Sequence, residues 1–178
     1  MINSYDIISL IERKFLIPMA LPHLFNVSNS PLKVKMVTTA YEGMTVAYLR
    51  YKVFVEEQQI HIDEEFDGSD AISVSFLLFL DHVPVGTMRY YKDEQGHIHP
   101  GRIAILKTYR NQGYGKKLLQ WFDQYLLGIY PDVHIVLHAQ KHLESFYQKL
   151  GYQSKGKTFL EANIEHIAME KKLKRSTF

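Results

Sequence analysis

An apolar stretch, a glycine-containing turn and an amphipathic segment follow one another in the second half of this chain. Residues 101–106 predict a strand, and the turn at 110–115 contains Gly113 and Gly115. Glycines let a backbone turn tightly and present successive N–H groups at the positive end of a helix, where an anion is favoured. The helix after the turn is predicted by an apolar stripe of Leu118, Leu119, Phe122 and Leu126. This order of elements predicts a phosphate-binding turn.

Two common nucleotide-binding motifs do not fit this turn. A P-loop would need glycine where Arg110 stands, and Ser or Thr where Lys117 stands. A dinucleotide fingerprint would need glycine in place of Leu118, after the first strand of a βαβ unit. Both nucleotide motifs are therefore excluded.

Composition narrows the class of protein. The 178 residues suit one domain, and the formal net charge of +2 favours neither nucleic acid nor a membrane surface as partner. The basic ending, residues 171–175, is interpreted as solvated. Cysteine is absent, which excludes disulfides, thiolate metal sites and a cysteine nucleophile. The longest apolar run, at about 74–80, is too short to span a bilayer, so we expect a cytoplasmic protein.

From Lys33 onwards the pattern predicts a mixed α/β domain, residues 33–178. Residues 1–32 contain an apolar helical stripe followed by three prolines, and they predict an extension rather than a second domain. We expect this extension to dock on the main body or on a second copy of the chain, which would make a homodimer. The predicted strands are 33–39, 72–81, 85–92, the one ending at 106, 133–137, 152–158 and 164–171; the predicted helices are 45–58, 113–128 and 143–150.

Three residues of the turn match a known family motif. Arg110, Gly113 and Gly115 fit the pattern Arg or Gln, two variable residues, Gly, one variable residue, then Gly or Ala, and so the turn resembles the acyl-CoA-binding motif of the GNAT (Gcn5-related N-acetyltransferase) superfamily. Segments 84–89 and 146–152 also resemble that family, in the same order. The resemblance implies a mixed, mostly antiparallel central sheet with helices on both faces.

A further resemblance is to a branch of small bacterial acetyltransferases. It rests on residues 53–58, followed by 159–161 and His166. The family implies transfer of an acetyl group from acetyl-CoA, as cosubstrate, to a primary amine of a small molecule or peptide. The alternative is a non-catalytic acyl-CoA-binding sensor or interaction module.

The resemblance also implies a binding site for coenzyme A. Its diphosphate would contact backbone N–H groups of the turn, with charge supplied nearby by Arg110 and Lys116; for both side chains, plain surface exposure is the alternative. Its pantetheine arm would lie along the preceding strand and bond to backbone groups, which leaves the side chains free to be core. The implied residues are Ile103, Ala104, Ile105, Arg110, Asn111, Gln112, Gly113, Tyr114, Gly115, Lys116 and Tyr147.

Catalytic candidates follow from the same resemblance. Tyr147 matches the tyrosine that many members use as general acid, although it also fits a core stripe beside Phe146. Glu57 lies where the family forms its acceptor pocket and is a candidate base or amine ligand, with a solvated carboxylate as the alternative. His166 is a second candidate for the base and for binding the acceptor amine, with a hydrogen-bonded strand histidine as its alternative.

Histidine pairs raise the question of a metal. His97 and His99 share a strand face, as do His134 and His138, but neither pair has a carboxylate at a clear ligand spacing. The sequence therefore predicts no metal site.

Overall fold

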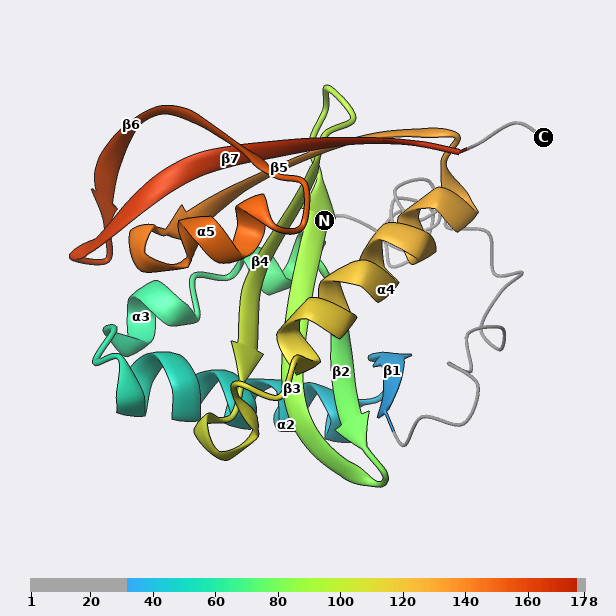
Figure 1. Ribbon diagram of the computed structural model, residues 1–178. Helices are drawn as coiled ribbons and strands as arrows, with labels where there is room; N and C mark the ends of the chain where they lie inside the picture. The colour runs from blue at the N-terminus through green and yellow to red at the C-terminus, as the bar shows by residue number, and fades with distance from the viewer. Residues whose placement is uncertain (1–31, 176–178) are drawn as a thin grey trace, which may run out of the picture.

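The computed structural model describes residues 32–175, and its centre is a seven-stranded sheet in the order β1-β2-β3-β4-β5-β7-β6 (Figure 1). Neighbouring strands are antiparallel except for the parallel pair β4 and β5. The strands are β1 Leu32–Met36, β2 Val74–Leu80, β3 Val83–Lys92, β4 Ile98–Ile105, β5 Asp132–Gln140, β6 Gln153–Glu161 and β7 Ile164–Lys174. The predicted extension lies outside the described residues, except for Leu32.

Helices cover both faces of the sheet (Figure 1). On one face α4, Tyr114–Ile129, packs its apolar stripe against Phe76 and Leu78 of β2. On the other face α2, Ala40–Arg50, packs Val46 and Leu49 against Leu77. Residues one apart on a strand point to opposite faces, so β2 contributes to both cores. The predicted mixed sheet flanked by helices is confirmed.

The first helix begins earlier than its apolar spacing predicted. Thr39 caps α2, because its hydroxyl accepts from the backbone N–H of Glu42 while the Glu42 carboxylate accepts from the N–H of Thr39. This is a capping box, and it starts the helix at Ala40 rather than at residue 45. The helix then widens into a π-helical segment, η1 Tyr51–Glu57, which the spacing of apolar residues did not reveal.

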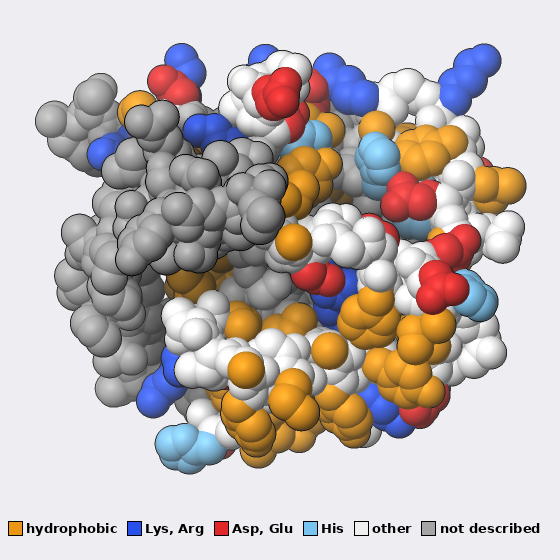
Figure 2. All heavy atoms as spheres, turned by 180° about the vertical axis from the view of Figure 1, so that it is seen from behind, with side chains coloured by type: hydrophobic (Ala, Val, Ile, Leu, Met, Phe, Trp, Pro, Cys, Tyr) orange, Lys and Arg blue, Asp and Glu red, His pale blue; other side chains and the backbone are white. Residues whose placement is uncertain are grey.

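The outer side of α2 is also apolar. Tyr41 is 79% exposed, and Met44 and Tyr48 are more than half exposed. Figure 2, which shows the molecule from behind, has hydrophobic side chains gathered over its lower part, where α2 runs. Only one of the two apolar sides of α2 therefore packs in the core.

The remaining short helices are α3 Ile62–Glu65, η2 Ser69–Ile72, η3 Lys107–Tyr109, η4 Lys141–Leu143 and α5 Glu144–Gln148. The predicted helix at 143–150 is therefore a single α-helical turn extended by a 3₁₀ turn. Within residues 32–175, no helix is long and apolar enough to cross a bilayer.

The strands β4 and β5 separate soon after they meet. They pair only at Ile98 and Ile135, and beyond that point β4 keeps a strand partner on its β3 side alone. A bulge bends β4 in the same region: Arg102 has φ of 50°, and the register with β3 jumps from Thr87–Ala104 to Arg89–Gly101. This separation opens the sheet at its centre.

Candidate functional site

A cleft of about 610 Å³ lies where β4 and β5 separate. Residues of β4 form one wall and residues of β5 the other, while the segment from η1 to η2 closes one side. Near the end of η1, the Gln140 side-chain N–H bonds to the Gln58 side-chain oxygen at 2.9 Å, which ties β5 to that segment. Lining side chains include Ile103, Leu137, His138, Tyr147 and His166.

The β4 edge that faces the cleft has no strand partner over residues 99–105 within the described chain. An exposed strand edge presents N–H and C=O groups to any peptide-like ligand. Ala104 is buried, and Ile103 and Ile105 are half-buried against the core. Both expectations for this segment are compatible, because the side chains pack inward while the backbone edge has no strand partner in the described part of the chain.

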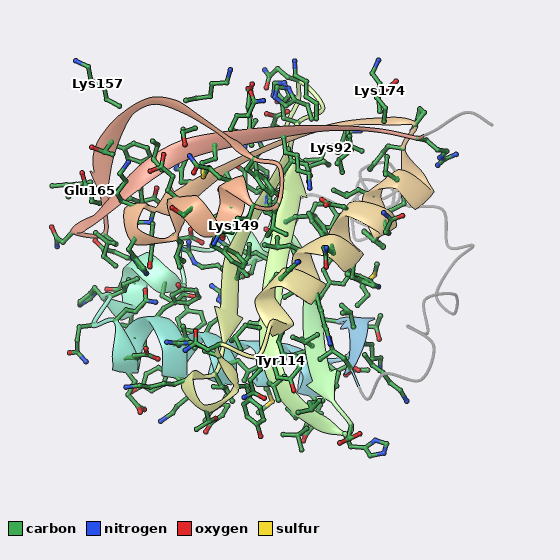
Figure 3. All side chains as sticks on the ribbon, in the orientation of Figure 1. Lys92, Tyr114, Lys149, Lys157, Glu165 and Lys174 are labelled. Atoms are coloured by element: carbon green, nitrogen blue, oxygen red, sulfur yellow. The ribbon has the colours of Figure 1, made fainter. Side chains whose placement is uncertain are left out.

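The turn after β4 presents a run of free backbone donors. Within residues 32–175, the N–H groups of residues 111–116 make no hydrogen bond, and α4 begins at Tyr114, which Figure 3 labels. Asn111 and Gly113 both have left-handed backbone conformations, with φ of 61° and 79°. Unpaired N–H groups at a helix N-terminus are a binding site for phosphate. The structure thus brings together the predicted residues of this turn.

Arg110 is engaged by the protein itself. Its Nε donates to the Ile105 carbonyl at 2.8 Å, and its Nη1 and Nη2 contact the two carboxylate oxygens of Glu57 at 2.6 and 2.7 Å. The hydrogen bond from Arg110 lowers the pKa of Glu57, so in this pair Glu57 is a weak base. Lys116 is exposed.

Tyr147 lies on α5 with its side chain lining the cleft. Its ring meets Phe146 and Tyr152 edge to face, with centroids 5.2 and 5.5 Å apart, while its hydroxyl has no hydrogen-bond partner among residues 32–175. Burial raises the pKa of Tyr147 to about 12. The hydroxyl is therefore always protonated near neutral pH and free to donate.

His166 lies on β7, is almost fully buried and lines the same cleft as Tyr147. Its Nδ1 is 2.8 Å from the Ile164 carbonyl oxygen, which can only accept, so Nδ1 carries the proton. In the neutral ring, Nε2 then holds a lone pair. The two interpretations of His166 are thus compatible, because Nδ1 makes the hydrogen bond of a strand histidine while Nε2 is available to accept a proton.

A network of charged side chains forms one side of the cleft, and sequence reasoning did not identify it. Glu65 is only 1% exposed, pairs with Arg50, and lies 2.8 Å from Nε of Arg102. Asp70 joins Arg50 and Arg89 at 2.6 and 2.9 Å. The available signal was Arg89, a charge in the middle of a mostly apolar and aromatic strand, because a buried charge needs a partner.

The histidines found in the sequence separate into different environments. His134 and His138 pair with different carboxylates, Glu170 at 3.3 Å and Glu161 at 2.8 Å. His97 and His99 instead share one carboxylate, that of Asp93. The expectation that no carboxylate supports either pair is wrong, because the β3–β4 turn brings Asp93 against His97 and His99, and Glu170 and Glu161 reach the other pair from β7 and β6.

The family of the chain is decided by comparison with known proteins. The family described as acetyltransferase (GNAT) domain matches residues 39–173. The chain belongs to the GNAT acetyltransferase family. Membership implies an acyl-CoA cosubstrate, and the unpaired β4 edge and the free N–H groups at α4 suit the amide and phosphate parts of such a molecule.

Relatives of this GNAT domain come from several bacteria. The uncharacterized protein YyaT of Bacillus subtilis is 33% identical over 153 residues, which cover 82% of this chain and 99% of YyaT. The uncharacterized N-acetyltransferase YjcF of Bacillus subtilis is 32% identical over 126 residues, covering 70% and 88%. The crystal structure of an acyl-CoA N-acyltransferase from Pseudomonas aeruginosa superimposes with a TM-score of 0.71 at 26% identity, covering 78% of this chain and 98% of that one.

Proposed function

We propose that the protein transfers an acetyl group from acetyl-CoA to a primary amine of a small molecule or peptide, by direct attack in a ternary complex. The observation that carries this proposal is the run of free N–H groups at residues 111–116, which follows along the chain from an unpaired strand edge that lines a cleft. Amides of the pantetheine arm suit the edge, and the diphosphate suits the turn. A cytoplasmic location stays a prediction.

In the proposed site, acetyl-CoA is bound mainly by backbone groups rather than by charged side chains. Arg110 is held by Glu57 and the Ile105 carbonyl, so its contribution is to fix the turn against β4. Lys116 is exposed and free to approach a phosphate. A backbone N–H within residues 103–105 would polarise the thioester carbonyl as charge develops on its oxygen.

The acceptor side of the cleft includes a carboxylate that is not paired with the arginines lining it. Glu64 lines it, and among residues 32–175 its side chain has no ion-pair or hydrogen-bond partner. We expect this carboxylate to attract the ammonium form of the acceptor. Nε2 of His166 would then take a proton from the amine, which becomes the nucleophile. His166 is favoured over Glu57 for this step, because Arg110 lowers the pKa of Glu57.

The transfer itself forms one bond and breaks another. The amine nitrogen attacks the carbonyl carbon, the C–N bond forms, the C–S bond breaks, and the proton lost by the amine ends on the sulfur of coenzyme A. Complete proton transfer from Tyr147, with a pKa of about 12, to a thiolate of pKa about 8.5 is uphill. Hydrogen-bond donation from Tyr147 to the departing sulfur is therefore the role we propose.

The test is an amine-panel assay with acetyl-CoA that follows free thiol, run on the full chain and on Tyr147→Phe and His166→Asn. Loss of general acid or base catalysis typically costs about 100-fold or more. We expect kcat to fall by at least roughly that factor in His166→Asn, and by about tenfold or more in Tyr147→Phe, which loses a hydrogen bond to a charged sulfur. The KM for acetyl-CoA should change little in either variant. The Tyr147→Phe variant keeps the ring contacts, so its thermal midpoint should match that of the parent.

Two outcomes would contradict the proposal in different ways. Protection against thermal unfolding by acetyl-CoA without turnover of any amine would identify a non-catalytic acyl-CoA-binding module. Absence of that protection would remove the cosubstrate site as well. Unchanged kcat in Tyr147→Phe would refute only the assignment of that residue.

A further inference from the structure

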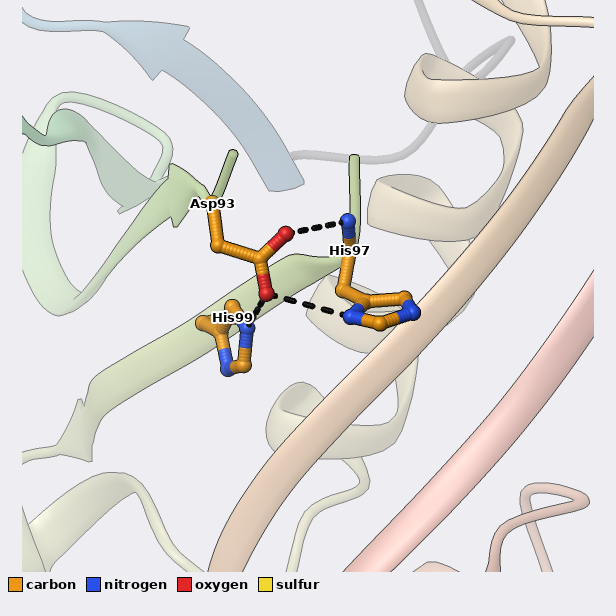
Figure 4. Close-up of side chains that lie close together, drawn as sticks. All are labelled: Asp93, His97 and His99. Carbon is orange, nitrogen blue, oxygen red and sulfur yellow. Dashed lines mark hydrogen bonds and ion pairs between the residues drawn. The ribbon is translucent and has the colours of Figure 1, made fainter. Parts of the chain in front are cut away.

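At the tip of the β3–β4 hairpin, away from the acyl-CoA turn, three side chains converge on one point (Figure 4). Asp93 directs one oxygen, Oδ2, toward both His97 Nδ1, at 3.1 Å, and His99 Nε2, at 2.8 Å. The three ligand atoms lie within 4.8 Å of one another. Within residues 32–175, this is the only group of three histidine, aspartate or glutamate side chains so close together.

The backbone of the hairpin turn holds this arrangement. The His97 N–H donates to Oδ1 of Asp93 at 2.7 Å, and the Asp93 N–H donates to the His97 carbonyl at 3.0 Å. Gly96, with φ of 88°, allows the turn to close. Oδ1 is therefore occupied by the backbone, while Oδ2 is left facing the two imidazole rings.

Neighbouring rings fix the orientation of both histidines. Tyr91 stacks on His99 with centroids 4.8 Å apart and planes within 9°. The His134 ring meets His97 edge to face at 4.6 Å, and its own Nε2 is occupied by Glu170. Packing of this kind limits the rotamers of the ligands, as outer-shell contacts do around known metal ions.

We propose that Asp93, His97 and His99 bind one divalent transition-metal ion, with zinc as the expected occupant. Zinc takes imidazole nitrogen and carboxylate oxygen at about 2.0–2.2 Å, so tetrahedral ligand atoms lie roughly 3.3–3.5 Å apart. The contacts to Oδ2 need to open by only about half an ångström to reach that spacing. Calcium and magnesium are disfavoured because they prefer oxygen ligands.

The remaining coordination position faces solvent. The side chains of Asp93, His97 and His99 are 21%, 35% and 24% exposed, so water has access to the site. His99 and Tyr91 also line the acceptor side of the cleft. A bound ion would thus lie at the rim of the cleft and cross-link the turn to β4.

The experiment titrates zinc chloride into untagged full-length protein that has been stripped with chelator, and follows heat of binding and thermal midpoint. We expect one equivalent of zinc per chain and a rise in the midpoint, because an ion that binds only the folded state stabilises it. Asp93→Asn and His99→Asn should each weaken binding by at least about tenfold. His82→Asn, at an exposed turn histidine outside the group, is the matched control and should bind as the parent does.

Cobalt(II) gives a second measurement. Its visible absorption depends on the number of nitrogen ligands, so the parent and His82→Asn should share a spectrum that His99→Asn loses. Circular dichroism of the ion-free variants checks that each is folded. Absence of stoichiometric binding, or binding that survives in the double variant of Asp93→Asn with His99→Asn, would overturn the proposal and leave the cluster as a hydrogen-bonded turn.

Discussion

In this protein, a side chain can act only through the atoms that its hydrogen-bond partners do not occupy. Arg110 matches the family motif, yet its guanidinium is occupied by Glu57 and by the Ile105 carbonyl. One nitrogen of His166 is likewise occupied: Nδ1 donates to a backbone carbonyl, and Nε2 keeps its lone pair in the neutral ring. In each case the residue type suggested a role, and the hydrogen bonds decided which atoms are left to perform that role.

The Arg110–Glu57 pair leads to a prediction for Glu57→Gln. Removing the charge abolishes the ion pair and one negative charge close to the proposed diphosphate site, so the KM for acetyl-CoA should fall or stay constant while kcat changes less than about tenfold. The pair is partly exposed, so stability should change by no more than about 1 kcal/mol. Steady-state kinetics and urea unfolding measure both. A loss of kcat of about 100-fold or more would instead support Glu57 as the base.

At the scale of elements, β4 has to approach β3 closely while its other edge stays open. Gly86 makes this approach possible: a Cβ at that position would lie 2.5 Å from the Ile105 Cδ1 and 2.7 Å from the Ala104 carbonyl oxygen. Real Cβ atoms do not come so near to backbone. Gly86 on β3 therefore helps to determine the position of the β4 edge that we propose for the pantetheine arm.

Gly86→Ala should both destabilise the protein and disturb the edge. Overpacking of this kind costs typically about 1–3 kcal/mol, measured by urea unfolding, and displacement of Ala104 should raise the KM for acetyl-CoA. Gly43→Ala is a suitable control, because nothing lies within 4 Å of a Cβ placed there. Equal stability and KM for Gly86→Ala and the parent would contradict the role assigned to this glycine.

The start of α2 predicts a pH dependence. Hydrogen bonds from Lys35 and from the N–H groups of Thr38 and Thr39 lower the pKa of Glu42 from 4.5 to about 2. The pKa is depressed in the folded state, so the stabilisation by Glu42 is complete above about pH 4.5 and is lost as the pH falls toward 2. The difference in free energy of unfolding between the parent and Glu42→Gln should shrink over that range. A difference independent of pH would contradict this assignment.

Across the whole molecule, the charged network attaches the segment between η1 and β2 to the strands that line the cleft. Burial raises the pKa of Glu65, and Arg50 and Arg102 oppose that effect by pairing with its carboxylate. Residues far apart in sequence thus fix one another, and the position of α3 beside the cleft depends on them.

Glu65→Gln tests this attachment. Removing one partner of a buried ion pair leaves arginine charge uncompensated, which costs about 3–5 kcal/mol. We expect a loss of that order in urea unfolding. Glu64→Gln is the matched control, because the neighbouring carboxylate is exposed, and it should change stability by less than about 0.5 kcal/mol. Similar losses for the two variants would show that the network does not anchor the segment.

Local spacing in the chain was sufficient to predict the helix after the glycine turn and most of the strands, but not the π-helical segment η1 beside the cleft. The stripe of α4, the glycine turn and most strands are visible in the local pattern of apolar, β-branched and glycine residues, and Leu118 and Phe122 are buried as expected. Packing between distant segments decided the rest: the separation of β4 from β5, the pairing of Glu57 with Arg110, and the network around Glu65. Periodicity records which side of an element is apolar, whereas ion pairs and strand edges depend on which elements meet. The family, with the acyl-CoA cosubstrate that it implies, was therefore readable from the sequence, whereas the partners of each charged group could be read only from the fold.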